Sequence, residues 1–119
     1  MGPKRAFGQS DSEKYEIIRN AIQRRKPISA VYHGKHRLLC PHQLGQNENG
    51  EHQALFYQFG GESLSRPLQR DGSPENWRCL TLSKLFAIQP IDGKWHTAPH
   101  TPQTQNCVKK VDFDVSQPE

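Results

Sequence analysis

Residues 28–44 restrict the fold more than any other stretch, because they read as two β-strands joined by a tight turn. Gly34 and Lys35 stand between two runs of β-branched, aromatic and aliphatic residues, and a two-residue loop containing glycine is a strong hairpin signal. With that loop, Tyr32 lies opposite Arg37. Strand alternation then places the following residues on one face of the predicted hairpin: Ile28, Ala30, Tyr32, Arg37, Leu39 and Pro41.

The predicted hairpin therefore sets an arginine against a tyrosine on a mostly apolar face. A guanidinium ion is costly to bury unless it meets a carboxylate, an aromatic ring or a ligand. Two outcomes follow for Arg37. It either packs on Tyr32 and pairs with a carboxylate such as Glu62, or it leaves its charge available to a bound anion.

Composition limits the size of the fold and the kind of partner. The chain has 119 residues, of which 33% are apolar, and a mean hydropathy of −0.88. One small domain with a tail fits this length, with a core drawn from the middle of the chain. Sixteen Lys and Arg against twelve Asp and Glu give a net charge of +4. This surplus permits a nucleic acid or another anionic partner without requiring one.

The location of the protein is predicted from what the sequence lacks. No stretch approaches the roughly 18 consecutive apolar residues of a membrane span, and the N-terminus has no apolar core of a signal peptide. Three widely spaced cysteines argue against a secreted disulfide framework. Cys79 alternates with apolar neighbours, so we expect it to be a small core residue. A cytoplasmic location and no membrane partner are the resulting predictions.

An N-terminal helix is predicted over residues 11–25. Ser10 suits the N-cap, and Glu13, three residues later, can reach back to the backbone of Ser10. Apolar residues then recur at helical spacing and form one stripe that faces the core. The stripe consists of Tyr15, Ile18 and Ile22.

Further strands are predicted at residues 52–59, 77–82, 85–88 and, less regularly, 108–115. The strand at 52–59 carries large apolar groups on both faces, so we expect it to be central, covered by the helix and by the curl of the sheet. The long polar loop at 62–76 is expected to be functional or disordered.

These elements predict an α+β, mostly β chain: a small antiparallel β-barrel or curled sheet preceded by one helix. The predicted organisation is a flexible N-terminus at 1–9, a barrel domain at 10–95, and a C-terminal arm at 96–119. The arm is expected to lie over the barrel.

Short motifs in a fixed order resemble those of a known family. They are Ile28-x-x-x-Tyr32-x-Gly34, Arg37-x-Leu39-x-Pro41-His42-x-x-Gly45, Tyr57-Gln58-x-Gly60-Gly61-x-Ser63, Trp77-Arg78 and Leu82-Ser83-Lys84-Leu85. Over about residues 14–91 the chain resembles the WYL domain, and especially short stand-alone bacterial WYL-like proteins without a helix-turn-helix. Residues 52–55 read HQAL where the family carries its Trp-Tyr-Leu.

The resemblance implies an Sm-like, SH3-type barrel that senses nucleic acids or small anionic ligands in a basic, aromatic-lined pocket and has a regulatory role. Arginine offers a planar fork to phosphate, lysine a point charge, glutamine and serine neutral hydrogen bonds, and tyrosine a stacking face. The predicted ligand-binding residues are Tyr32, Arg37, His42, Gln58, Ser63 and Lys84.

Metal binding and catalysis are the weaker interpretations. His33, His36, Cys40 and His42 lie within ten residues, but exposed turn histidines explain them better than a metal site. Cys40 and His42 share a strand face without a third group to orient the base. We therefore predict a protein with no metal, no cofactor and no enzymatic activity.

The predicted function is binding of a nucleotide or single-stranded nucleic acid, reported to a partner encoded elsewhere. The alternative is a protein-binding accessory subunit with no ligand of its own, in which Trp77, Trp95 and a strand edge form the interface. Open strand edges also make a homodimer a reasonable expectation.

Overall fold

The computed structural model describes residues 8–63, 67–100 and 106–116. This part of the chain is an α+β fold, mostly antiparallel sheet with one α-helix, which confirms the predicted class. The elements are α1 (Asp11–Arg24), β1 (Ile28–Tyr32), β2 (Lys35–Gln46), β3 (His52–Gly61), β4 (Trp77–Thr81), β5 (Leu85–Pro90) and β6 (Lys110–Asp114), with 3-10 turns η2 (Pro74–Asn76) and η3 (Leu82–Lys84). No described helix has the length and apolar character needed to span a membrane. The predicted flexible segment 1–9 lies mostly outside the described residues.

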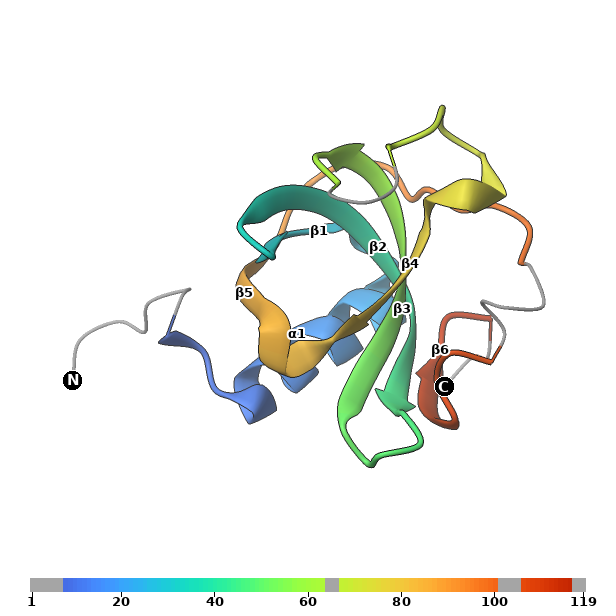
Figure 1. Ribbon diagram of the computed structural model, residues 1–119. Coiled ribbons are helices and arrows are strands. Elements are labelled where there is room, and N and C mark those ends of the chain that lie inside the picture. The colour runs from blue at the N-terminus through green and yellow to red at the C-terminus, as the bar shows by residue number, and fades with distance from the viewer. Residues whose placement is uncertain (1–7, 64–66, 101–105, 117–119) are drawn as a thin grey trace.

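The strands form one strongly curved sheet in the order β4-β3-β2-β1-β5 (Figure 1). β6 pairs with β2 beyond the end of β1, so one side of β2 carries two strands in succession. Among the described residues no pairing joins β4 to β5. The sheet is therefore open, with these two strands at its ends.

Helix α1 begins as the sequence predicts. The Ser10 side chain accepts a hydrogen bond from the Glu13 amide, and the Glu13 carboxylate accepts one from the Ser10 amide. The helix ends at Arg24, one residue early, because Arg25 adopts a left-handed conformation with φ 51°. Ile18 and Ile22 are buried on its inner face.

The hairpin turn lies one residue earlier than predicted. His33 and Gly34 form the loop with φ of 53° and 73°, so Tyr32 faces Lys35 and Ala30 faces Arg37. Positive φ at both central residues is typical of a type I′ turn, whereas a loop at Gly34 and Lys35 would have needed a type II′ turn with positive φ at Gly34 alone. The pairing of Tyr32 with Arg37 was wrong, but each residue keeps its face because its partner moved by two positions.

Strand β2 contributes to two cores because its alternation changes along its length. The register with β3 shifts between Pro41 and Gln43, which is an irregularity of the kind a β-bulge introduces. Cys40 consequently faces the outer core and Leu44 the inner one. The inner core, against α1, contains Ile18, Ala21, Ile22, Ile28, Ala30, Leu39, Leu44, Ala54, Phe56, Leu80, Leu82, Leu85 and Ile88. The outer core contains Cys40, Leu55, Tyr57, Trp77 and Val108.

Strand β3 is central, as predicted, because it pairs with β2 and β4. Its outer face, however, is not covered by the curl of the sheet. Trp95, Ala98 and Val108, from the chain that follows β5, pack there instead. The predicted arm therefore completes the second core.

The prediction for the cysteines was wrong. A disulfide joins Cys79 of β4 to Cys107, with their Cα atoms 6.2 Å apart. Cys40 is the free cysteine and is completely buried. An odd cysteine count argued against a disulfide, but the third cysteine lies inside the outer core.

Candidate anion site at Arg37

Arg37 is buried beneath the hairpin end of the sheet, with 4% of its surface exposed. Its guanidinium carbon lies 5.2 Å from the centre of the Tyr32 ring. Nη1 donates to Gln58 Oε1 at 3.3 Å, and Nη2 donates to the Tyr32 carbonyl at 3.4 Å. Both hydrogen bonds are long for a charged donor, which normally bonds below 3 Å. The guanidinium is therefore positioned but weakly compensated.

No carboxylate of the described residues forms an ion pair with Arg37, so the expected alternative partner Glu62 does not neutralise it. The Arg37 Nε atom is buried without a hydrogen-bond partner. Burial lowers the pKa of Arg37 from its ordinary value, yet a guanidinium stays protonated at neutral pH. Arg37 is thus a buried cation that has donors to spare.

Gln58 is completely buried, and its hydrogen bonds fix the direction from which its side chain meets Arg37. Its amide nitrogen donates to the carbonyls of Gly60 and Glu62 at 3.0 and 2.9 Å. Because both N–H groups are used, the amide oxygen must point the other way, toward Arg37. The sequence predicted Gln58 as a site residue, and the structure brings it to Arg37.

Gly61 makes this arrangement possible. Its φ is +83°, and a Cβ at this position would overlap the carbonyl oxygen of His36 on β2. Only glycine fits such a close approach of two strands with positive φ. The end of β3 can therefore turn back and present the two carbonyls that orient Gln58.

Tyr32 is half-buried, and burial raises the pKa of its phenol, although the nearby Arg37 charge opposes the shift. The His33 ring meets the Tyr32 ring edge-on, with centroids 4.3 Å apart. The tyrosine therefore already has two neighbours, and its ring has less free surface for stacking than predicted.

Two lysines border Tyr32. Lys84 is exposed and directly precedes Leu85, the β5 partner of Tyr32. Lys35 is half-buried and lies opposite Tyr32 on β2, on the same face as Arg37. The sequence analysis missed Lys35 because it placed this residue in the turn. Considering a type I′ loop at His33 and Gly34 beside the type II′ loop at Gly34 and Lys35 would have placed it on the strand.

His42 does not join the group around Arg37, and in the described part of the chain no hydrogen bond joins Ser63 to Arg37. Ser63 is half-buried next to residues outside the described ranges. His42 belongs to the outer core, where its ring lies 4.7 Å from Trp77 and 4.9 Å from Trp95. Its Nδ1 bonds the Cys40 carbonyl at 2.8 Å and its Nε2 bonds Thr97 Oγ1 at 3.0 Å.

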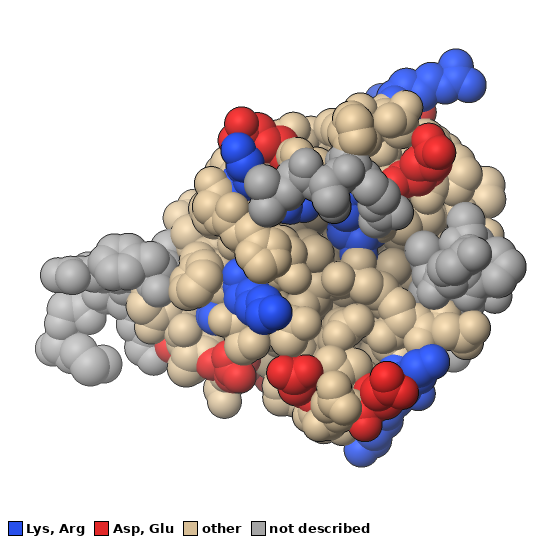
Figure 2. Space-filling model, in the orientation of Figure 1, with Lys and Arg blue, Asp and Glu red and all other residues tan. Residues whose placement is uncertain are grey.

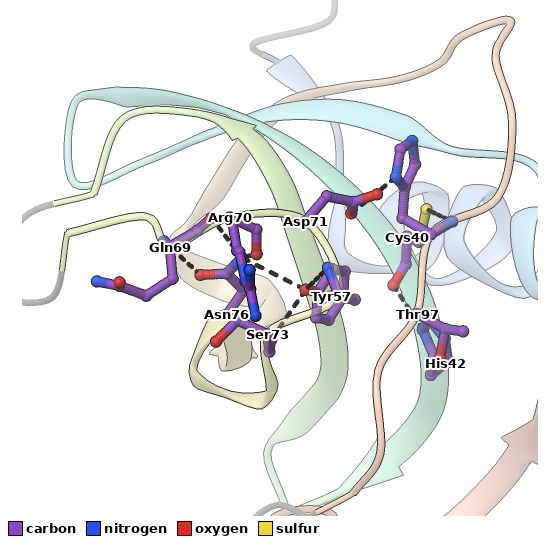
Figure 3. A network of polar contacts seen from close by, with 11 residues as sticks. Cys40, His42, Tyr57, Gln69, Arg70, Asp71, Ser73, Asn76 and Thr97 are labelled. Carbon is purple, nitrogen blue, oxygen red and sulfur yellow. Dashed lines mark hydrogen bonds and ion pairs between the residues drawn. The ribbon is translucent and has the colours of Figure 1, made fainter.

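A second polar network lies on the outer side of β3 (Figure 3). The Tyr57 hydroxyl donates to the Ser73 carbonyl and accepts from the Gly72 amide, both at 2.8 Å. Asn76 donates to the carbonyls of Gln69 and Arg70 and accepts from the Gln69 amide at 2.7 Å. This network explains why residues 67–76 adopt a defined conformation.

A hollow of about 340 Å³ lies beside this network, lined by Arg70, Asp71, Gly72, Ser73 and Pro74. Asp71 bonds His96 Nδ1 at 2.9 Å, and the His96 ring stacks on Phe59 with centroids 4.1 Å apart. Asp71 thus ties the loop that lines the hollow to His96 of the arm.

The structure also places the residues considered for metal binding and for nucleophilic catalysis. His36 faces Val31 across the hairpin while His33 is in the turn, so the two are not opposite each other. In the described ranges no three His, Cys, Asp or Glu side chains group as a metal site. Burial raises the pKa of the Cys40 thiol to about 12, which keeps it protonated.

The residues predicted for a protein interface are largely used inside the chain. Trp77 is 2% exposed, and its indole N–H donates to the Pro99 carbonyl at 2.9 Å. Trp95 is half-buried against His42.

Comparison with protein-family models, with curated proteins and with solved structures finds no match for this chain.

Proposed function

We propose that the chain is a non-enzymatic module that binds an anionic ligand, a nucleotide or a single-stranded nucleic acid, by placing one phosphate on Arg37. The buried Nε atom of Arg37 without a partner carries this proposal. Removing a charged group from water without compensation is costly, so an arrangement of this kind favours a ligand that supplies the missing charge.

The available donors suit an oxyanion. Nη1 and Nη2 each use one N–H on a neutral acceptor, and Nε uses none. Nε and Nη together offer the parallel fork that a phosphate or carboxylate accepts. Lys35 and Lys84 border Tyr32 and would add point charges beside it.

The surface charge supports contact with one or a few phosphates more than a long nucleic-acid track. On the face shown in Figure 2, basic and acidic side chains are interspersed over a mostly uncharged surface. A track for a long strand needs a continuous basic groove.

We include in this proposal a finer assignment of the fold and of the kinship of the chain. The curl of the sheet, its strand order and the helix at its start support a small SH3-type barrel, and the quoted motifs support kinship with WYL-like modules.

Calorimetric titration at low salt tests the proposal, with inorganic phosphate, adenosine monophosphate and a short oligothymidine as the probes. We expect binding of at least one probe, and a loss of affinity of about 10-fold or more in Arg37→Met. Arg24→Met is the matched control, because it removes the same charge from an exposed position at the end of α1.

Equal losses of affinity in the two variants would show that only the net charge of the protein matters. The absence of binding for every probe would contradict the proposal. The slope of affinity against salt concentration then separates a single phosphate contact from several.

A further inference from the structure

The last strand, β6, packs on the inner core through half-buried Phe113, with Val115 just beyond its end. It has five residues and pairs with residues 43–46 of β2. Within the described stretch 106–116 the buried residue is Val108, at 3% exposure, and the strand itself is exposed or half-buried. Apolar burial is what normally holds an edge strand in place, and here it is limited to buried Val108 and the half-buried side chains of Phe113 and Val115.

Polar contacts of β6 lie mainly at the surface. The Tyr15 hydroxyl donates to Asp112 at 2.7 Å, and Arg25 donates to the Val115 carbonyl at 2.8 Å. Gln43 donates to Asp114 at 2.7 Å in a partly buried position. Because water competes for such groups, each contact adds little to the attachment of the strand.

Gly45 shows that the contact between β6 and β2 is backbone against backbone. A Cβ at this position would overlap the carbonyl oxygen of Lys110, and the register of the pair shifts between Leu44 and Gly45. The two strands therefore approach closely where no side chain separates them. This close contact therefore requires that β6 be held in register with β2.

The Cys79–Cys107 disulfide supplies that restraint. Cys107 lies three residues before Lys110, the first residue of β6, and its carbonyl accepts a hydrogen bond from Gln53 at 3.2 Å. Both bridged cysteines are half-buried, whereas Cys40 is completely buried. The bridged cysteines therefore lie closer to the surface than the free cysteine.

We propose that Cys79–Cys107 is a reversible redox site, and that its reduction by a dithiol releases β6 and uncovers the edge of β2 at residues 43–46. In this reaction a thiolate of the dithiol attacks one bridge sulfur, the S–S bond breaks, and a mixed disulfide forms. The second thiol of the reductant resolves it. Two electrons and two protons pass to Cys79 and Cys107, and the reductant leaves as its own disulfide.

Hydrogen exchange of the full chain before and after treatment with dithiothreitol tests this proposal. The Lys109 amide donates to the Gln46 carbonyl and the Val115 amide to the His42 carbonyl, both at 2.8 Å, so these two amides report the docking of β6. We expect reduction to accelerate their exchange about 10-fold or more, with less than about 2-fold change in β1 and α1.

Two controls tie the effect to the bridge. Thiol titration in denaturant should find one thiol in the oxidised chain and three after reduction, since Cys40 is the free cysteine. The double variant Cys79→Ser, Cys107→Ser should exchange like the reduced protein and should not respond to dithiothreitol.

Three results would overturn the proposal. Unchanged exchange at Lys109 and Val115 after reduction would mean that β6 holds without the bridge. Accelerated exchange throughout the chain would mean that the bridge stabilises the whole fold rather than one strand. Three free thiols after incubation with oxidised glutathione would mean that no bridge forms.

Discussion

Arg37 and His42 are five residues apart on one strand and almost equally buried, at 4% and 3% exposure, yet their surroundings differ. Both ring nitrogens of His42 have partners, and two tryptophans enclose the ring. Arg37 keeps a buried Nε without a partner and no described carboxylate beside it. The comparison teaches that two equally buried polar side chains on one strand can differ in how fully their polar atoms are paired, so burial alone does not mark a functional residue.

The largest expected effect tests the outer core. Trp77→Ala removes a side chain that is 2% exposed and contacts His42, Tyr57 and His100. We expect the free energy of unfolding to fall by about 3–5 kcal/mol, because a large cavity remains. Urea denaturation measures it. A loss below about 1 kcal/mol would mean that the arm does not form a genuine second core.

Acid should destabilise the outer core through protonation of His42. Burial lowers the pKa of His42 to about 4 from an ordinary value of 6.5. The unfolded chain therefore binds a proton before the folded chain does. Stability from this residue is complete above pH 6.5 and is lost as the pH falls toward 4, by about 3 kcal/mol in all.

The difference between wild type and His42→Gln, measured by urea denaturation from pH 7 to pH 4, isolates this contribution. The wild type should lose more stability than the variant across that window. Parallel curves would show that His42 is protonated as easily in the folded protein as in the unfolded chain.

A smaller effect is expected where one hydroxyl is removed from the outer network. Tyr57→Phe deprives the Gly72 amide and the Ser73 carbonyl of their partner. We expect a loss of about 1–3 kcal/mol, since buried polar groups lose their hydrogen bonds, and faster proteolysis within residues 67–76. Unchanged proteolysis would mean that Asn76 holds the loop without Tyr57.

The smallest expected effect on stability falls on Arg37. Arg37→Met replaces a weakly compensated buried charge by an apolar side chain of similar length, so stability should change by less than about 1 kcal/mol or increase. Anion binding should be lost in the same variant. A large loss of stability would show that Arg37 is structural and would remove the contrast with His42.

The sequence predicted the helix, the positions of the strands along the chain and the face on which Arg37 lies, because capping and alternation are local patterns. It missed Lys35 because the choice between two adjacent turns depends on backbone conformation at His33. Alternation already places His42, five residues on, on the opposite face from Arg37, whereas it does not reveal the irregularity at Pro41–Gln43 that returns Leu44 to the inner face. The bridge between Cys79 and Cys107 joins β4 to the chain just before β6, and no local signal records that proximity.

The hydrogen bonds of Gln58 have a consequence for the chemistry of residue 58. A glutamate here would be almost isosteric and would give Arg37 an internal counter-ion. One of its carboxylate oxygens, however, would face the carbonyl oxygens of Gly60 and Glu62, which now accept from the amide, and three oxygens without a proton between them repel one another. The backbone carbonyls at the end of β3 therefore disfavour a glutamate at position 58, and Arg37 keeps its positive charge without an internal counter-ion.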